Sequence, residues 1–232
     1  MARRTVMRDS LGVAIATGTY GLSFGAVGVT SGLDVAQTCV LSLLMFTGAS
    51  QFALVGVLGA GGSAVSGAFT ALLLGTRNTL YGLRLAPLLE YRGWRRAVAA
   101  HVLIDESTAM AVHRADRDLA RTGFWTTGGT IFVLWNLTTF AGAVAGEQLG
   151  DPRDLGLDAA VGAAFLALLW PRLSSPLSRL TAALAALVAA GAVSVTPAGV
   201  PVLVAAGVAV LVGALAPRST DAAAGIDEGD AR

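Results

Sequence analysis

Eight long apolar segments follow one another along this 232-residue chain and constrain its fold more than any other feature. They comprise residues 11–30, 35–60, 64–89, 97–113, 124–146, 156–171, 177–195 and 198–216. A run of about 20 apolar residues crosses the roughly 30 Å hydrocarbon core of a bilayer as one helix. Only 13% of the residues are charged, against about 25% in soluble domains. The pattern predicts an all-α, polytopic integral membrane protein with about 7–8 hydrophobic segments.

Both ends of the chain are interpreted in the same terms. Arg3, Arg4 and Arg8 precede a first segment long enough to span a membrane, which favours a retained helix over a cleaved signal peptide. Residues 217–232 are small, polar and acidic, and predict a short disordered cytoplasmic tail. We therefore expect one polytopic transmembrane domain over residues 1–216.

Arginines in short loops predict the orientation, because such loops stay on the cytoplasmic side. Arginine-rich ends and loops occur before segment one, after segment four and after segment six, at Arg3, Arg4, Arg8, Arg114, Arg117, Arg121, Arg172 and Arg179. Glu147, Asp151 and Asp154 mark an outer loop. Both termini are then cytoplasmic, in the inner membrane of a bacterium. The net charge of +1 offers no basic surface for nucleic acid.

One loop disagrees with strict alternation, which would put Arg92, Arg95 and Arg96 outside. Segment three is interrupted by Gly75-Thr76-Arg77-Asn78, and segment four is short and contains two carboxylates. If both segments enter and leave on the same side, the arginine loop becomes cytoplasmic. Non-helical backbone at that depth requires protein or a water-filled cavity around it. Eight full spans and a re-entrant arrangement of segments three and four both stay open.

A short internal similarity favours a duplicated architecture. Gly32-Leu33-Asp34, followed by Ala36 and Leu44, recurs as Gly156-Leu157-Asp158, followed by Ala160 and Leu168. Internal repeats are common in secondary transporters, although so few identities also arise by coincidence. Both copies begin on the outer side in this topology, so the repeats would be parallel.

Polar residues at membrane depth predict a site. Placing an ionisable group there costs about 2.5–3.5 kcal/mol by insertion scales, and such groups usually line a substrate or ion pathway. The planar guanidinium of Arg77 suits the carboxylate of an amino acid, whereas Asp105 or Glu106 suits its ammonium group or a coupling proton. The predicted substrate-binding residues are Ser50, Gln51, Arg77, Asn78 and Tyr81, with Asp105 and Glu106 assigned to proton or ion coupling or to the substrate amine.

A structural interpretation of the same residues stays open. Arg77 and Arg84 balance the charges of Asp105 and Glu106, which would form an ion-paired lock between two segments. Ser50 and Gln51 would then serve helix packing. His101 lies four residues before Asp105, on the same face if the helix is continuous, and would form a hydrogen bond or a proton relay with it.

Several other classes of function are disfavoured. The single Cys39 rules out an internal disulfide and makes a thiolate metal site improbable, and we predict no metal and no cofactor. The chain has no phosphate-binding loop and no lysine, so it is not itself an ATPase. Ser50 and His101 resemble a hydrolase dyad only weakly, because the GxS pattern is common. We predict a non-enzyme; a channel or the membrane component of another small-solute transporter are the alternatives.

The motifs together resemble the AzlC family. They are Thr47-Gly48-Ala49-Ser50-Gln51-Phe52, Arg77 with Leu80-Tyr81-Gly82-Leu83 and Leu85-Ala86-Pro87, Asp105-Glu106-Ser107, Gly21-Leu22-Ser23-Phe24-Gly25 and Gly156-Leu157-Asp158. The resemblance implies the large subunit of a two-component carrier of the LIV-E type. It would export leucine, isoleucine and valine, with methionine as a further candidate, driven by an ion gradient and assisted by a small AzlD-type membrane subunit. Asn78, where the family often has histidine, and Arg84, where a small polar residue is usual, put the exact substrate in question.

Overall fold

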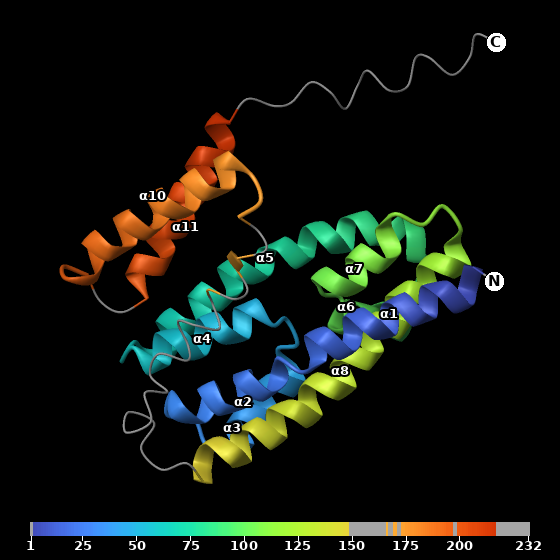
Figure 1. Cartoon of the computed structure of the whole chain (residues 1–232), viewed down its shortest axis with the longest axis horizontal. Coiled ribbons are helices and arrows are strands. Elements are labelled where there is room, and N and C mark those ends of the chain that lie inside the picture. Colours follow the sequence, from blue (N-terminus) through green and yellow to red (C-terminus); the bar gives the residue numbers. More distant parts are fainter. Residues whose placement is uncertain (1, 149–165, 167–168, 171–172, 197–198, 217–232) are drawn as a thin grey trace. The chain divides into compact units, whose positions relative to one another are not determined.

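The computed structural model describes residues 2–148, 166, 169–170, 173–196 and 199–216. The chain divides into two compact units, Met1–Pro171 and Arg172–Arg232, and each is described by itself. All regular structure among the described residues is helical (Figure 1), which confirms the predicted all-α membrane fold. Within that part of the chain, three stretches are long and apolar enough to cross a bilayer: Ala2–Thr30, Arg117–Gln148 and Pro176–Val193.

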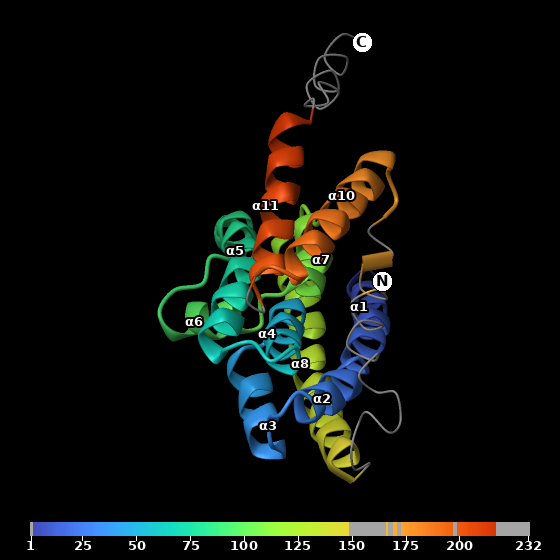
Figure 2. The same cartoon turned by 90° about the vertical axis from the view of Figure 1, so that its left-hand side faces the viewer.

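Two parallel helical stretches pack side by side in the first unit. Helices α1 (Ala2–Gly18) and α2 (Gly21–Thr30) run beside the long helix α8 (Arg117–Gln148). Glycines permit this approach, because a Cβ on Gly25 would meet the backbone of α8, and one on Gly142 would meet the backbone of α2. Figure 2 shows α8 between α1 and α5.

Segment two folds back on itself instead of crossing. Helix α3 (Val35–Leu44) leads toward the middle of α8, where Phe46 lies 5.1 Å from Phe132 between ring centroids. Helix α4 (Ala49–Gly59) returns, so that Gly59 lies against Ser31, at the end of α2 where α3 began. Each helix rises about 15 Å, roughly half the hydrocarbon core.

Segment four folds back from the opposite end. Helix α6 (Trp94–His101) leads inward and helix α7 (Asp105–Val112) leads out again along α8, with Met110 against Gly123. The chain enters and leaves at one level, since Arg117 at the start of α8 forms an ion pair of 2.7 Å with Glu90. Figure 1 shows the α3–α4 and α6–α7 hairpins at opposite ends of this unit.

Segment three departs from prediction. Helix α5 (Ala64–Leu89) is continuous through Gly75 and Arg77, so the predicted break in it is wrong. One interior glycine costs only about 1 kcal/mol relative to alanine, which does not break a helix of 26 residues. Of the two arrangements left open, the structure shows the fold-back of segment four, but its counterpart is segment two and not segment three.

The arrangement is an inverted structural repeat. Residues 2–59 contain a long helical stretch, α1 and α2, followed by a hairpin at its far end, and residues 64–112 contain a second long helix, α5, of opposite direction, followed by a second hairpin. This relation differs from the predicted parallel repeat. The first copy of that predicted sequence repeat, Gly32-Leu33-Asp34, forms the turn before α3. There the Asp34 carboxylate accepts a hydrogen bond from the Gln37 amide at 2.7 Å. The second copy lies outside the described residues.

With the two hairpins in place, nine described arginines of the first unit lie at one end. The amino terminus, the α5–α6 loop and the α7–α8 loop share that end, and they contain Arg3, Arg4, Arg8, Arg92, Arg95, Arg96, Arg114, Arg117 and Arg121. The described parts of the opposite end contain acidic residues, Asp34 and Glu147, and no arginine. The loop at residues 92–96, which strict alternation would put outside, therefore lies at the same end as the other arginine-rich loops.

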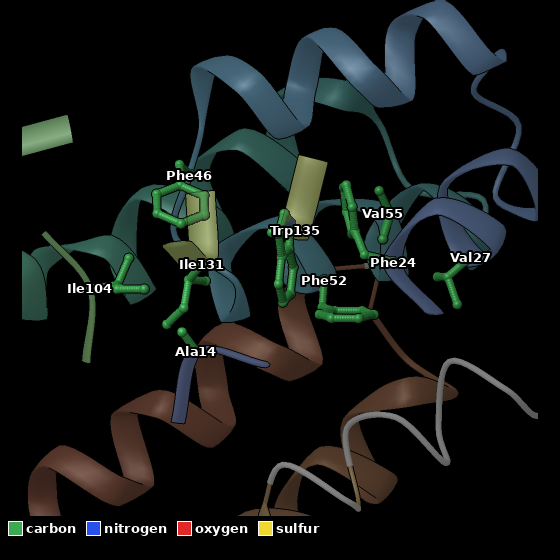
Figure 3. Close-up of a cluster of buried hydrophobic side chains, with 9 residues drawn as sticks. All are labelled: Ala14, Phe24, Val27, Phe46, Phe52, Val55, Ile104, Ile131 and Trp135. Atoms are coloured by element: carbon green, nitrogen blue, oxygen red, sulfur yellow. The ribbon is translucent and has the colours of Figure 1, made fainter. Parts of the chain in front are cut away.

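Aromatic packing joins the first hairpin to the crossing helices. Phe24, Phe52 and Trp135 contact one another, with ring centroids 5.5, 6.1 and 6.3 Å apart. Figure 3 shows them within a cluster that also contains Ile104 from the second hairpin and Ile131 from α8. The α3–α4 hairpin is therefore anchored by buried side chains on α2 and α8.

The second unit contains two antiparallel helices, α10 (Pro176–Val193) and α11 (Val200–Leu215). They match the predicted segments 177–195 and 198–216 closely. Ser175 caps α10 by accepting a hydrogen bond from the Ser178 amide at 3.1 Å. Most of segment 156–171 and the whole predicted tail at 217–232 lie outside the described residues.

Candidate functional site

The first hairpin consists of α3 and α4, and its tip is formed by residues 45–48 between them. Gln51 holds this tip in place. Its side-chain oxygen accepts a hydrogen bond from the Gly48 amide at 3.1 Å, and its nitrogen lies 3.4 Å from the Ser42 carbonyl oxygen, which accepts from it. Gly48 itself has φ of 60°, a left-handed value that favours glycine. Because Gln51 is fully buried and committed to the backbone, its role in this structure is to position the tip.

Ser107 holds the tip of the second hairpin in the equivalent way. Its hydroxyl accepts a hydrogen bond from the Ile104 amide at 3.0 Å, and the carbonyl oxygen of Val102 lies 3.0 Å away as an acceptor. Ser107 is three residues after the helix cap, as Gln51 is in α4. The two tips thus use the same device at the same position.

The centre of α5 meets the second tip through two polar contacts. Arg77 forms an ion pair with Asp105 at 3.1 Å, and the two side chains are 26% and 23% exposed. The Asn78 amide nitrogen donates to the Leu103 carbonyl oxygen at 3.4 Å. Part of the predicted ion-paired lock is therefore present, on the same residues that were predicted to bind substrate.

A cavity of about 780 Å³ lies between the tips, α3, α4 and α5. Its polar side chains are few, and they belong to Gln37, Thr47, Asn78 and His101. Most of the lining is aliphatic or aromatic, from Leu33, Val40, Leu41, Leu44, Met45, Phe46, Leu54, Leu58, Ala64, Ala100 and Leu103. The lining reaches the end opposite the arginine-rich loops at Leu33 and Ala64, so the cavity extends from the tips toward that end. An apolar cavity with a few polar groups, most of them at the tips, suits a small amphiphilic solute.

His101 lies at this cavity, but without the predicted relation to Asp105. It ends α6, whereas Asp105 begins α7 after a three-residue break, so the two residues do not share a helix face. Its ring packs instead against Phe132, at 5.5 Å between centroids, and Phe46, at 6.5 Å. The sequence contained no signal for this packing, because Phe132 is distant along the chain.

The helix ends at the tips are electrically distinct. α4 and α7 both begin at mid-depth, and a helix amino terminus bears a partial positive charge. The first turn of α7 contains Asp105 and Glu106, which compensate that charge. The first turn of α4 contains no acidic residue.

The structure brings most of the predicted site residues to one region and leaves others apart. Ser50, Gln51, Arg77, Asn78 and Asp105 lie at the tips or at the part of α5 facing them. Tyr81 packs instead against the second core cluster, which includes Leu85, Leu89 and Phe124. Arg84 is exposed on α5. Glu106 is in the first turn of α7, half-buried.

No cluster of three or more histidine, cysteine or carboxylate side chains able to hold a metal ion exists among the described residues. Ser50 and His101 do not form the hydrolase dyad. The Ser50 hydroxyl has no hydrogen-bond partner in the described part of the chain.

Comparison with known proteins identifies the family. The family model described as AzlC protein matches residues 12–149. The chain belongs to the AzlC family. The matched region extends from the second half of α1 to the end of α8 and includes both hairpins and every predicted site residue.

Relatives of this AzlC protein are named as membrane proteins. The inner membrane protein YgaZ of Escherichia coli is 28% identical over 212 residues, which cover 87% of this chain and 84% of YgaZ. An uncharacterized membrane protein of Archaeoglobus fulgidus is 31% identical over 65% of this chain and 67% of its own length. One from Helicobacter pylori is 32% identical over 39% of this chain, and the match spans only 40% of that protein. No solved structure matches. Together the family and its relatives support a membrane transport-associated role.

Proposed function

We propose that this AzlC protein is the permease subunit of a secondary carrier that exports branched-chain amino acids. The observation that carries the proposal is the pair of half-membrane hairpins whose tips meet at a largely apolar cavity beside Arg77 and Asp105. Broken helices that present backbone groups at mid-depth are a recurrent device of transporters. The aliphatic lining suits the side chain of leucine, isoleucine or valine, with methionine as a further candidate.

An ion gradient drives the export in this proposal. Asp105 and Glu106 are the carboxylates at the tips, and we propose that they accept the substrate ammonium group or a coupling proton. The pairing of Asp105 with Arg77 makes the charge balance of the site sensitive to either event. Nothing in the described part of the chain supports nucleotide-driven transport by this subunit alone.

The arginine-rich end faces the cytoplasm in this proposal, because loops rich in arginine remain on that side. The amino terminus is then cytoplasmic and the cavity extends toward the outer side. We propose the inner membrane of a bacterium as the location, with a small AzlD-type membrane subunit as the partner.

Efflux of preloaded radiolabelled amino acids tests the proposal. Cells that express this chain together with the candidate small subunit should release leucine and valine faster than cells with either subunit alone, and a protonophore should abolish the difference if protons drive export. Lysine efflux serves as the control, because its charged side chain does not suit the aliphatic cavity. If no branched-chain amino acid leaves faster with both subunits present, the substrate assignment is wrong.

A further inference from the structure

The amino terminus of α4 is a polar position buried at mid-depth that the chain does not satisfy by itself. Ser50, in the first turn of this 11-residue helix, is 2% exposed, and its hydroxyl has no hydrogen-bond partner among the described residues. An unpaired buried hydroxyl is destabilising, because it has given up its hydrogen bonds to water without replacing them. Such a cost is expected where a ligand completes the hydrogen bond.

Space beside this hydroxyl is provided by Gly75 of α5. A Cβ placed on Gly75 would lie 3.7 Å from Ser50 Oγ, an ordinary contact distance, so α5 packs closely beside the serine only because residue 75 has no side chain. Asn78, one turn further along α5, lines the cavity and has a buried Oδ1 without a partner in the described structure. Thr47, two residues before the first residue of α4, lines the cavity too. The cavity therefore reaches the residues that precede α4.

The electrostatics select an anion. The positive end of α7 is compensated by its own two carboxylates, whereas that of α4 is not. Backbone amides at a free helix terminus, with a serine hydroxyl beside them, form a common binding arrangement for carboxylates and phosphates. Arg77 is less available than its position in the sequence indicates, because Asp105 is already paired with it at 3.1 Å.

We propose that the carboxylate of the transported amino acid binds at the amino terminus of α4, on the Ser50 hydroxyl, and not on Arg77. The inference rests on the proposed function for the identity of the ligand. The substrate then lies across the meeting point of the tips, with its carboxylate toward α4 and its ammonium group toward the carboxylates of α7.

Calorimetric titration of the purified full chain tests this subsite with three compounds. Leucine has both charges, 4-methylpentanoate retains only the carboxylate, and 3-methylbutylamine retains only the amine. Ser50→Ala should weaken leucine and 4-methylpentanoate by roughly 10- to 100-fold, the range for one hydrogen bond to a charged group. It should leave 3-methylbutylamine unchanged.

Gly75→Ala provides a second variant, since its methyl group would cover Ser50 at an ordinary contact distance and should reproduce the selective loss. Gly82→Ala is the matched control two turns further along α5, where a Cβ meets nothing within 4 Å, and it should bind all three compounds as the wild type does. Ser42→Ala controls for removal of a buried serine hydroxyl in the same hairpin.

The outcomes separate the subsite from the proposed function. If the wild type binds leucine and both Ser50→Ala and Gly75→Ala retain its affinity, the subsite is overturned and the proposed function stands. If 4-methylpentanoate binds in a Ser50-dependent manner but leucine is not exported from cells, the subsite stands and the proposed function fails. Binding of none of the three compounds overturns the subsite, as does an equal loss for all three in Ser50→Ala.

Discussion

At the scale of single residues, the pairing of Arg77 with Asp105 is the interaction whose energy matters most. The two side chains are about one-quarter exposed, which places the pair between surface ion pairs and fully buried ones. Surface pairs contribute about 0–1 kcal/mol, whereas loss of one partner from a buried pair costs about 3–5 kcal/mol, because the remaining charge is left without compensation. The pair connects the centre of α5 to the second tip and thereby couples α5 to the α6–α7 hairpin.

Single neutralisations of this pair should destabilise the protein more than the double one. We expect Arg77→Gln or Asp105→Asn alone to cost about 1–3 kcal/mol, and the double variant to recover most of that loss, since no lone charge remains. Thermal unfolding of the detergent-purified chain measures the coupling. The exposed pair of Arg117 and Glu90 is the control and should show a coupling below about 1 kcal/mol. Strictly additive losses at Arg77 and Asp105 would contradict the assigned interaction.

At the scale of helices, the contact between α2 and α8 depends on residues without side chains. Gly25 lies against the backbone of α8 at Thr139 and Ala143, and Gly142 lies against the backbone of α2 at Leu22. Between membrane helices, where lipid is as apolar as leucine, close approach of backbones is a main source of attraction. This contact joins α2, which leads into the α3–α4 hairpin, to α8, which follows the α6–α7 hairpin.

Adding one methyl group at this contact should disrupt the fold. Gly25→Ala places a Cβ inside the backbone of α8, so we expect a large loss of monodisperse protein in size-exclusion chromatography and a lower melting temperature. Gly12→Ala in α1 is the matched control, because a Cβ there meets nothing within 4 Å. It should be neutral or slightly stabilising, by up to about 1 kcal/mol from helix propensity. Equal behaviour of the two variants would show that the α2–α8 contact is not as close as described.

The helices also show how far the sequence predicts the structure. The apolar runs gave the membrane class and most helix positions, and the balance of charges indicated that Arg77 and Asp105 meet. The path of the backbone was not predictable in the same way. An apolar run of 26 residues at 35–60 has the length of one span, and two half-length helices have the same composition. Conversely, Arg77 and Asn78 indicated a break in α5 that does not exist, because their side chains reach partners on the second tip.

At the scale of the whole first unit, the inverted repeat fits the proposed carrier, in which access to the site alternates between the two ends. Each hairpin enters from one end and stops at mid-depth, so movement of either one opens the meeting point toward its own end only. In the described conformation the cavity extends toward the end opposite the arginine-rich loops, while the contacts of Arg77 and Asn78 with the second tip lie on its other side. We expect the opposite conformation to separate α6 and α7 from α5. In inverted repeats the two conformations are commonly related by exchange of the halves.

The last prediction concerns the membrane topology that the hairpins impose. If α6 and α7 enter and leave on the same side, positions before and after them must share a compartment. In a Cys39→Ser background, Arg95→Cys and Arg117→Cys should both resist an impermeant maleimide added to intact cells, and both should react after permeabilisation. Glu147→Cys, exposed at the opposite end of α8, should react without permeabilisation and controls for expression at the surface. Reaction of Arg95→Cys in intact cells with protection of Arg117→Cys would mean that residues 94–112 cross the membrane. The α6–α7 hairpin, and the inverted repeat built on it, would then be wrong.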